Sequence, residues 1–248
     1  MRPSWVAGGV LFFLCFCVAP ASAQTEVLTN GSFESGLTGW TTATNLGGGA
    51  TGTCGYNGAV APGTETLTSV AGFPATDGTQ LALGSVSQTA GAGLIVSCVL
   101  YQDVAIPANA TTASFSFDIG VKNALNNNNT NNAAVVGIYS TATVPAFGDS
   151  AVVGGVSGKV NYTQATDVTL HSQASASFNI SSRAGTTVRF AIINAANNSG
   201  HENIGIDNVQ FLVNAAPTAV PTLSEWGLAM VGLMLGCSGF YLLRRRMA

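Results

Sequence analysis

Two histidines, His171 and His201, are the first candidates for catalysis or metal binding, because the sequence holds no others. His201 is followed by Glu202, but Gly205 stands where the second histidine of a helical zinc-binding HExxH motif would be. A single histidine in a segment rich in glycine and asparagine is most often solvated. The histidines therefore predict no zinc-dependent chemistry.

Two glycine-rich segments resemble catalytic or cofactor motifs only in part. Residues 155–159 (GVSGK) lack the second glycine of a nucleophile elbow, where Lys159 stands. Residues 47–52 (GGGATG) match GxGxxG, but no strand–helix–strand unit surrounds them. A pair of carboxylates for glycoside hydrolysis is defined by its separation in space, and no spacing in the sequence supports one. We expect no enzyme, and a secreted hydrolase is the weakest of the functions considered.

The cysteines indicate an exported protein with one disulfide. Of the five cysteines, Cys15 and Cys17 lie in an apolar run near the N-terminus and Cys237 lies in another near the C-terminus. Only Cys54 and Cys98 remain in the body, and two cysteines in an exported body favour a disulfide. The alternative is a pair of buried free thiols.

Composition excludes one large class of partner. The chain has 248 residues, of which 47% are hydrophobic and only 8% are charged, and its formal net charge is −3. The basic residues concentrate at the C-terminus, so the body is more acidic than the whole chain. A nucleic-acid-binding surface needs clustered basic side chains to neutralise phosphates, so we expect no nucleic-acid partner.

The N-terminus has the pattern of a secretory signal peptide. Arg2 supplies the positive charge, residues 6–18 form the apolar run, and Ala21-Ser22-Ala23 supplies small residues before the cut. We predict that residues 1–23 are removed by signal peptidase, which leaves Gln24 first. The alternative is an uncleaved anchor, although the run is shorter than the ~20 residues that span a bilayer.

The C-terminus carries a second apolar run, residues 227–243, followed directly by Arg244, Arg245 and Arg246. An uncharged run of this length lies at the lower edge of the range that spans a bilayer. A basic cluster next to such a run stays on the cytoplasmic side. We therefore predict a transmembrane helix in the inner membrane, with the body on the outer side.

The segment before this run carries a recognisable motif, VPTLSEW, made of Val220, Pro221, Thr222, Leu223, Ser224, Glu225 and Trp226. With the apolar helix and the arginines it resembles the IPTL-CTERM sorting signal of Gram-negative bacteria, with Val220 in place of the usual isoleucine. The resemblance covers residues 220–248. It implies cleavage near the motif by an exosortase-type transpeptidase, which would release the body or transfer it to the cell surface. An ordinary single-pass anchor is the alternative.

The body alternates between apolar and polar residues with a period of two. In residues 113–121, Phe115, Phe117 and Ile119 share one face, which is typical of a half-buried strand. Similar segments predict strands over 26–30, 80–88, 95–104, 113–121, 133–140, 158–163, 168–178, 187–194 and 205–213. The asparagine-rich run 123–132 predicts a long exposed loop. We therefore expect an all-β body, a single jelly-roll-like β-sandwich over residues 24–214, with a linker over 215–219.

Short motifs along the body give a second resemblance. Residues 30–34 (NGSFE) with Gly39-Trp40, residues 77–80 (DGTQ), residues 102–107 (QDVAIP) and residues 205–209 (GIDNV) resemble the galactose-binding-like jelly rolls of carbohydrate-binding modules. The resemblance implies a sandwich fold and a structural Ca²⁺ held by Glu34 and Asp207, since hard carboxylate oxygens suit this ion. Alternatively, both carboxylates are solvated or capped by backbone N–H groups.

Aromatic side chains are the usual stacking platforms for sugars. The body has one tryptophan, Trp40, which we expect in the core, and Tyr56, Tyr101, Tyr139 and Tyr162 are the remaining candidates.

Taken together, these patterns predict a non-catalytic structural or adhesive protein on the cell surface or in the extracellular matrix of a Gram-negative bacterium. Its expected partners are signal peptidase, the exosortase-type enzyme, the inner membrane before processing, and an extracellular polysaccharide. The main alternative is a carbohydrate-binding module with a defined glycan ligand.

Overall fold

A computed structural model describes most of the body and the C-terminal helix. The described residues are 23–46, 51–60, 73–90, 95–123, 133–153, 160–161, 169–197, 201–216 and 225–247. Residues 1–22 of the predicted signal peptide, 124–132 of the asparagine-rich loop and 217–219 of the predicted linker therefore lie outside the described residues.

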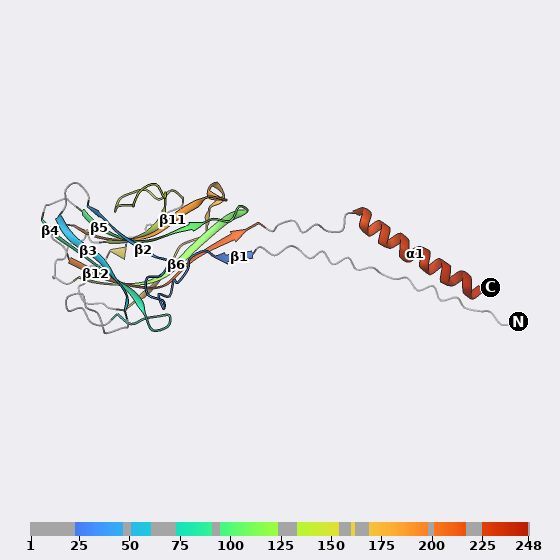
Figure 1. Cartoon of the computed structure of the whole chain (residues 1–248), viewed down its shortest axis with the longest axis horizontal. Coiled ribbons are helices and arrows are strands. Elements are labelled where there is room, and N and C mark those ends of the chain that lie inside the picture. The colour runs from blue at the N-terminus through green and yellow to red at the C-terminus, as the bar shows by residue number, and fades with distance from the viewer. Residues whose placement is uncertain are drawn as a thin grey trace.

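The described part of the body is a sandwich of two antiparallel sheets (Figure 1). The seven-stranded sheet has the order β10-β6-β12-β4-β3, with β1 also pairing with β12 and β9 with β6. Its strands are β1 (Ala23–Glu26), β3 (Thr51–Val60), β4 (Leu81–Ala90), β6 (Ala110–Asn123), β9 (His171–Ala174), β10 (Phe178–Asn179) and β12 (His201–Ala215).

The five-stranded sheet has the order β2-β5-β11-β7-β8. Its strands are β2 (Thr41–Leu46), β5 (Ile95–Ala105), β7 (Ala133–Tyr139), β8 (Val160–Asn161) and β11 (Thr187–Asn197). A short 3₁₀ helix, η2 (Ser181–Arg183), precedes β11, and α1 (Glu225–Met247) follows the sandwich. The predicted all-β sandwich is confirmed.

The core lies between the two sheets, and it is formed by the side chains that the alternation of apolar and polar residues places on the inner face of each strand. Phe115, Phe117 and Ile119 of β6 are buried in the main cluster, as their shared face predicts. Phe190 of β11, in the opposite sheet, packs edge-on against Phe115 with 5.7 Å between the ring centres. Burial of apolar surface between the sheets is the main stabilising term for such a fold.

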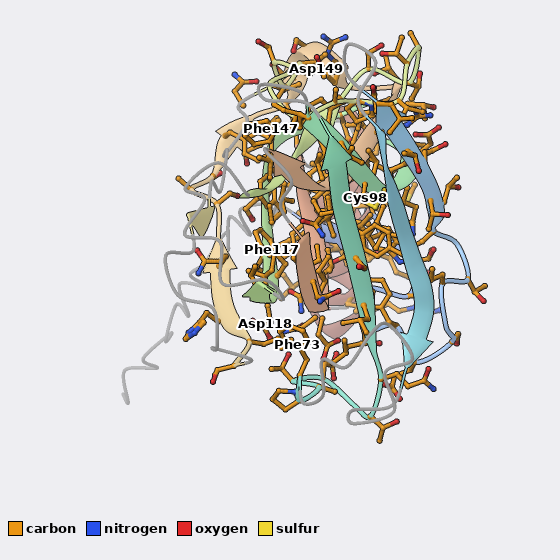
Figure 2. The ribbon with its side chains drawn as sticks, turned by 90° about the vertical axis from the view of Figure 1, so that its left-hand side faces the viewer. Phe73, Cys98, Phe117, Asp118, Phe147 and Asp149 are labelled. Atoms are coloured by element: carbon orange, nitrogen blue, oxygen red, sulfur yellow. A yellow bond between two sulfur atoms is a disulfide. The ribbon has the colours of Figure 1, made fainter. Side chains whose placement is uncertain are left out.

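Each sheet also has an outer face that the chain itself covers. Residues 73–80, which we name the clamp loop, place Phe73 against Leu81, Leu83 and Leu170 on the seven-stranded sheet. Residues 140–152, which we name the strap, cover the outer face of the five-stranded sheet with Val144 and Phe147. Figure 2 shows Phe73 and Phe147 at opposite ends of the view.

The strand predictions differ from the structure mainly at sheet edges. The predicted strand 26–30 is wrong beyond its first residue, since Glu26 is the last residue of β1 and residues 27–30 form no strand. The predicted strand 168–178 is divided between β9 and β10. Of the predicted strand 158–163, the described part is β8. No strand is predicted where β2 and β3 lie, because these edge strands are rich in threonine, glycine and asparagine and bury few large side chains.

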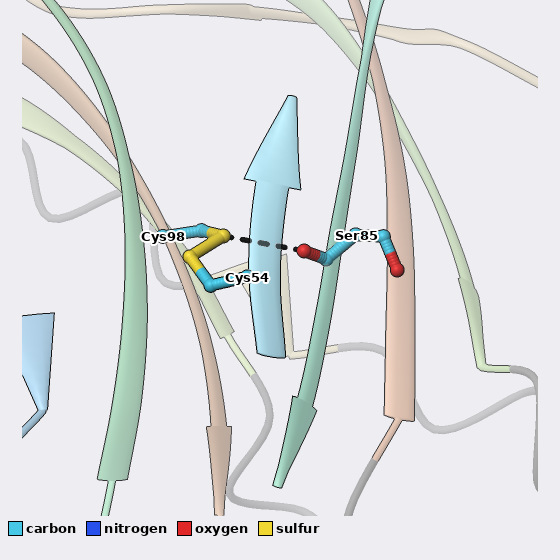
Figure 3. Close-up of a disulfide and its surroundings, with 3 residues drawn as sticks. All are labelled: Cys54, Ser85 and Cys98. Carbon is cyan, nitrogen blue, oxygen red and sulfur yellow. Dashed lines mark hydrogen bonds between the residues drawn. A yellow bond between two sulfur atoms is a disulfide. The ribbon is translucent and has the colours of Figure 1, made fainter. Parts of the chain in front are cut away.

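The predicted disulfide between Cys54 and Cys98 is confirmed (Figure 3). It joins β3 of one sheet to β5 of the other, with 5.4 Å between the two Cα atoms. Val86 and Val96 pack around it, and Cys98 is fully buried. The Sγ atom of Cys98 lies 3.2 Å from the backbone oxygen of Ser85, a contact and not a donated hydrogen bond, since a disulfide sulfur carries no hydrogen.

Candidate functional site

The C-terminal tail forms the helix that its apolar run predicts. Helix α1 contains the whole of the predicted segment 227–243, and its apolar side chains are exposed, Leu233 at 67% and Phe240 at 72%. Near its end the guanidinium of Arg245 lies 5.4 Å from the ring centre of Tyr241. Among the residues that the structure describes, no helix has both the length and the apolar character to cross a membrane. The predicted span is thus not shown and stays a prediction.

The sorting motif straddles the start of this helix. Its residues 220–224 lie outside the described residues, and Glu225 and Trp226 are the first two residues of α1. At the other end of the chain, Ala23 and Gln24, which flank the predicted signal-peptide cut, form the start of β1. They pair with the last residues of β12, Ala23 opposite Ala215.

Asp207, one of the two predicted calcium ligands, is fully buried and receives hydrogen bonds from the clamp loop. The backbone N–H groups of Thr76 and Asp77 donate to its Oδ2 atom at 2.6 and 2.9 Å. The N–H of Asn208 donates to Oδ1 at 2.7 Å. Burial raises the pKa of Asp207, although these hydrogen bonds favour the charged form.

Glu34, the second predicted ligand, holds the other end of the same loop. The N–H groups of Thr79 and Gln80 donate to its Oε1 atom at 2.7 and 2.6 Å, and the Thr79 hydroxyl lies 3.0 Å from Oε2. The backbone hydrogen bonds from Thr79 and Gln80 lower the pKa of this exposed carboxyl group. Gly78 has a positive φ of 78°, and a Cβ there would lie 2.5 Å from the Glu34 carboxyl carbon.

The observed donor set does not fit the calcium site that the resemblance implies. A Ca²⁺ ion needs six to eight oxygen ligands directed at one point. Glu34 and Asp207 instead direct oxygens at separate pairs of N–H groups. Within the described ranges, no three His, Cys, Asp or Glu side chains gather where they could hold a metal ion. The arrangement matches the alternative of carboxylates capped by N–H groups.

The structure does bring two carboxylates together, Asp118 of β6 and Asp207 of β12, which are opposite each other in the strand register. The hydroxyl oxygen of Thr76 lies 2.6 Å from Oδ2 of Asp118 and 3.3 Å from Oδ2 of Asp207. Asp118 is 6% exposed and Asp207 is 0% exposed. Carboxylates of a glycosidase must reach the bond that they cleave, whereas these two are buried and already bonded to the clamp loop. The pair therefore has a structural role.

The other chemical candidates from the sequence are scattered. His171 is exposed on β9, whereas His201 begins β12, and β6 lies between these two strands in the sheet. Lys159 and residues 47–50 lie outside the described residues. His171 is opposite Ile119 in the strand register, one residue along β6 from Asp118.

The aromatic candidates for sugar stacking are buried (Trp40 and Tyr139) or partly buried (Tyr56 and Tyr101), wherever the structure describes them. Trp40 lies in the core as predicted, 7% exposed, and its indole N–H donates to the Asn30 carbonyl at 3.0 Å. Tyr139 is 4% exposed beneath the strap. Tyr101 lies under the guanidinium of Arg189, 3.9 Å from its ring centre. Tyr56 packs inward against the core, and Tyr162 lies outside the described residues.

Arg189 fastens the strap, a role that the sequence does not reveal. Its Nε and Nη2 atoms donate to the two carboxylate oxygens of Asp103 at 2.7 and 2.8 Å. Its Nη1 atom donates to the backbone oxygen of Thr143 in the strap at 2.9 Å. Hydrogen bonding to Asp103 raises the pKa of Arg189, so its charge is fixed. Asn45 adds a hydrogen bond from its side-chain amide to the oxygen of Val144.

One surface pocket lies beside the end of the clamp loop. It has a volume of about 420 Å³, and polar groups from Glu26, Asn30, Asp77 and Asn208 contribute to its lining. The Glu26 carboxylate is occupied there by the N–H groups of Leu28 and Phe211. The pocket is therefore polar and lacks an aromatic side chain among its lining residues.

Comparison with known protein families identifies the motif in the tail. Residues 218–246 match the IPTL-CTERM motif. No curated protein matches the chain. Among solved structures, TmCBM61 in complex with β-1,4-galactotriose has 13% identity and a TM-score of 0.41, over 75% of this chain and 97% of that one.

Two further solved structures have different activities in their names. The K1 cleaved adhesin domain of Lys-gingipain from Porphyromonas gingivalis W83 has 14% identity and a TM-score of 0.40, over 79% of this chain and 99% of that one. Arabinose-bound MgGH51 α-L-arabinofuranosidase has 12% identity and a TM-score of 0.43, over 76% of this chain and 26% of that one. Similarity at this level carries no argument about activity. The chain is thus a β-sandwich protein that ends in an IPTL-CTERM motif.

Proposed function

We propose that this chain is an exported surface protein, in which a non-catalytic sandwich serves a structural or adhesive role and the C-terminal tail is a sorting signal. The observation that carries the proposal is the IPTL-CTERM match over residues 218–246. The match includes the motif, most of α1 and the three arginines.

The positions at which the chain enters and leaves the sandwich support separate roles for the sandwich and the tail. Because β1 pairs with the end of β12, the mature N-terminus and the start of the tail leave the sandwich at the same end (Figure 1). The tail can then enter the membrane while the rest of the sandwich extends away from it. Arg244, Arg245 and Arg246 would remain cytoplasmic, and Trp226 would fix the depth of the motif at the headgroup level.

The same pairing sets the order of the two cleavages. A peptidase needs its substrate strand extended and unpaired, whereas Ala23 and Gln24 are hydrogen-bonded partners of β12 in the folded sandwich. Signal peptidase therefore acts before β1 pairs. The sorting enzyme acts on residues 220–226, which follow β12, and so can act on the folded protein. It breaks one peptide bond there, which releases the tail with a free amino group, and transfers the acyl group of the body to water or to an acceptor nucleophile on the surface.

The structural or adhesive role is preferred over a stacking glycan site because the described tyrosines of the sandwich are covered by the core, by Arg189 or by the strap. It is preferred over hydrolysis because the Asp118–Asp207 pair is buried. An extracellular polysaccharide remains the proposed partner, through hydrogen bonds and not through aromatic stacking. Glycan binding that is lost when Tyr101 is changed would favour the carbohydrate-binding module instead.

The test is the intact mass of the protein purified from its own host after fractionation. We expect a chain that begins at Gln24, ends within residues 220–226, and is found in the surface or secreted fraction. Pro221→Ala should leave the tail attached and hold the chain in the inner membrane, because the extended conformation that proline imposes on the motif is lost.

Pro217→Ala is the matched control, since Pro217 precedes the matched segment 218–246. This variant should be processed as in the wild type. A wild-type mass that runs to Ala248 in the inner membrane would refute sorting and leave a tethered domain.

A further inference from the structure

We infer that the clamp loop is fastened by carboxylate-to-amide hydrogen bonds that take the place of a bound divalent cation, so that this part of the sandwich does not need calcium. The inference rests on the contacts of Asp207 and Glu34 and is independent of the proposed sorting function. It runs against the ion that the galactose-binding-like resemblance implies.

The loop offers its amides in two successive pairs. Thr76 and Asp77 give their N–H groups to Asp207, and Thr79 and Gln80 give theirs to Glu34. Successive backbone N–H groups of this kind form a concave site for a negative charge. Here the negative charge in each site is a carboxylate of the chain itself, one on a strand and one in the loop before β2.

Electrostatics oppose a cation at the same place. Each N–H dipole directs its positive end at the oxygen that it binds, so a cation on that oxygen would face the positive ends of two N–H dipoles. Gly78 stands between the two amide pairs, where its positive φ turns the loop from one carboxylate towards the other. The two carboxylates thus bind different amide pairs of the loop, Asp207 the pair before Gly78 and Glu34 the pair after it.

Asp118 adds a third acidic group beside Asp207 without creating a cage. The Thr76 hydroxyl has one hydrogen, so it can donate to only one of the two carboxylates at a time. The side-chain amide of Asn208 lies 3.4 Å from Oδ2 of Asp118 and supplies a further donor. The neighbours of the pair that the structure records are therefore hydrogen-bond donors of the loop and of β12.

The experiment is thermal unfolding of the full chain in mild detergent, in excess EDTA and in millimolar CaCl₂. We expect the same melting temperature in both solutions. Asp207→Asn should lower it by about 5–10 °C in both, because an amide nitrogen replaces a buried oxygen that receives N–H groups. Glu34→Gln should lower it less, since Glu34 is exposed and glutamine keeps one acceptor.

Asp149→Asn is the matched control. It removes the same charge from an exposed carboxylate that receives one amide, the N–H of Ala146, and should shift the melting temperature least. A wild-type melting temperature that rises in CaCl₂, with the rise lost in Asp207→Asn or Glu34→Gln, would overturn the inference. If Asp207→Asn does not fold, the wild type and Glu34→Gln still decide between the two outcomes.

Discussion

The burial of Tyr139 depends on the strap that packs over it. The Tyr139 side chain is 4% exposed on the outer face of β7 and belongs to the cluster that Val144 and Phe147 of the strap complete. Burial, and next the negative charge of Asp149, raise the pKa of Tyr139 from 10.0 to about 12. The neutral phenol is therefore the form that the folded protein favours.

The raised pKa predicts a loss of stability in alkali. Below pH 10 the phenol is neutral in both states. Between pH 10 and 12 only the unfolded chain ionises it, so unfolding becomes easier as the pH rises. A difference of two pKa units corresponds to about 3 kcal/mol, which is reached in full only above pH 12. In urea unfolding, Tyr139→Phe should lack this part of the decline and Asp149→Asn should reduce it. Equal pH profiles for Tyr139→Phe and the wild type would contradict the burial of the phenol.

At this scale the sequence predicts residue types better than partners. The core position of Trp40 could be predicted, because it is the single tryptophan of the body and a large apolar side chain tends to be buried. The Cys54–Cys98 disulfide could be predicted, because these are the two cysteines of the predicted exported body. The pairing of Arg189 with Asp103 could not, because it depends on the register between β5 and β11. For the same reason the Asp118–Asp207 pair is visible only when β6 and β12 are aligned.

The clamp loop shows how an element is positioned by missing side chains. Gly120 of β6 and Gly205 of β12 are opposite each other, and Phe73 lies on the flat surface that they leave. A Cβ at Gly205 would lie 2.8 Å from the Phe73 ring, and one at Gly120 would also lie 2.8 Å from it. The glycines therefore provide the close approach that lets the loop reach Asp207.

Gly205→Ala should consequently destabilise the fold through overpacking. We expect a loss of about 1–3 kcal/mol in the free energy of unfolding, because Phe73 is fully buried and cannot move aside freely. Gly55→Ala in β3 is the control, since nothing lies within 4 Å of its added Cβ. It should be neutral or slightly stabilising. Equal effects of the two substitutions in urea titrations would show that Phe73 does not rest on the glycines.

Strands with a large buried face are predictable as elements, as residues 113–121 within β6 show. The clamp loop and the strap are not, because each is held by backbone hydrogen bonds and by one or two apolar side chains, which leave no periodic pattern in the sequence. Edge strands β2 and β3 fall between these cases. They are strands because their backbones pair with β5 and β4, whereas their amino-acid composition does not predict a strand.

On the scale of the whole molecule, the disulfide joins the two sheets where the edge strand β3 meets β5. The linked residues are 44 positions apart in sequence, so the bond closes a long loop in the unfolded chain. Such a bond stabilises mainly by restricting the unfolded state, by about 4 kcal/mol for a loop of this length in the chain-entropy model. The proposed location outside the cell is an oxidising environment in which such a bond persists.

Cys54→Ala combined with Cys98→Ala should therefore lower the free energy of unfolding by about 3–5 kcal/mol, the closed-loop effect plus the packing lost around the buried sulfurs. Cys237, the remaining cysteine in the described part of the chain, is exposed. The disulfide variant and its parent should therefore both carry Cys237→Ala, which prevents disulfide exchange between chains.

A mild reductant in native buffer should leave the Cys54–Cys98 bond intact, because Cys98 is fully buried. Cleavage of the bond should follow only when urea unfolds the sandwich. A bond that is reduced without denaturant, or a double variant as stable as its background, would show that β3 is not held to β5 by this link.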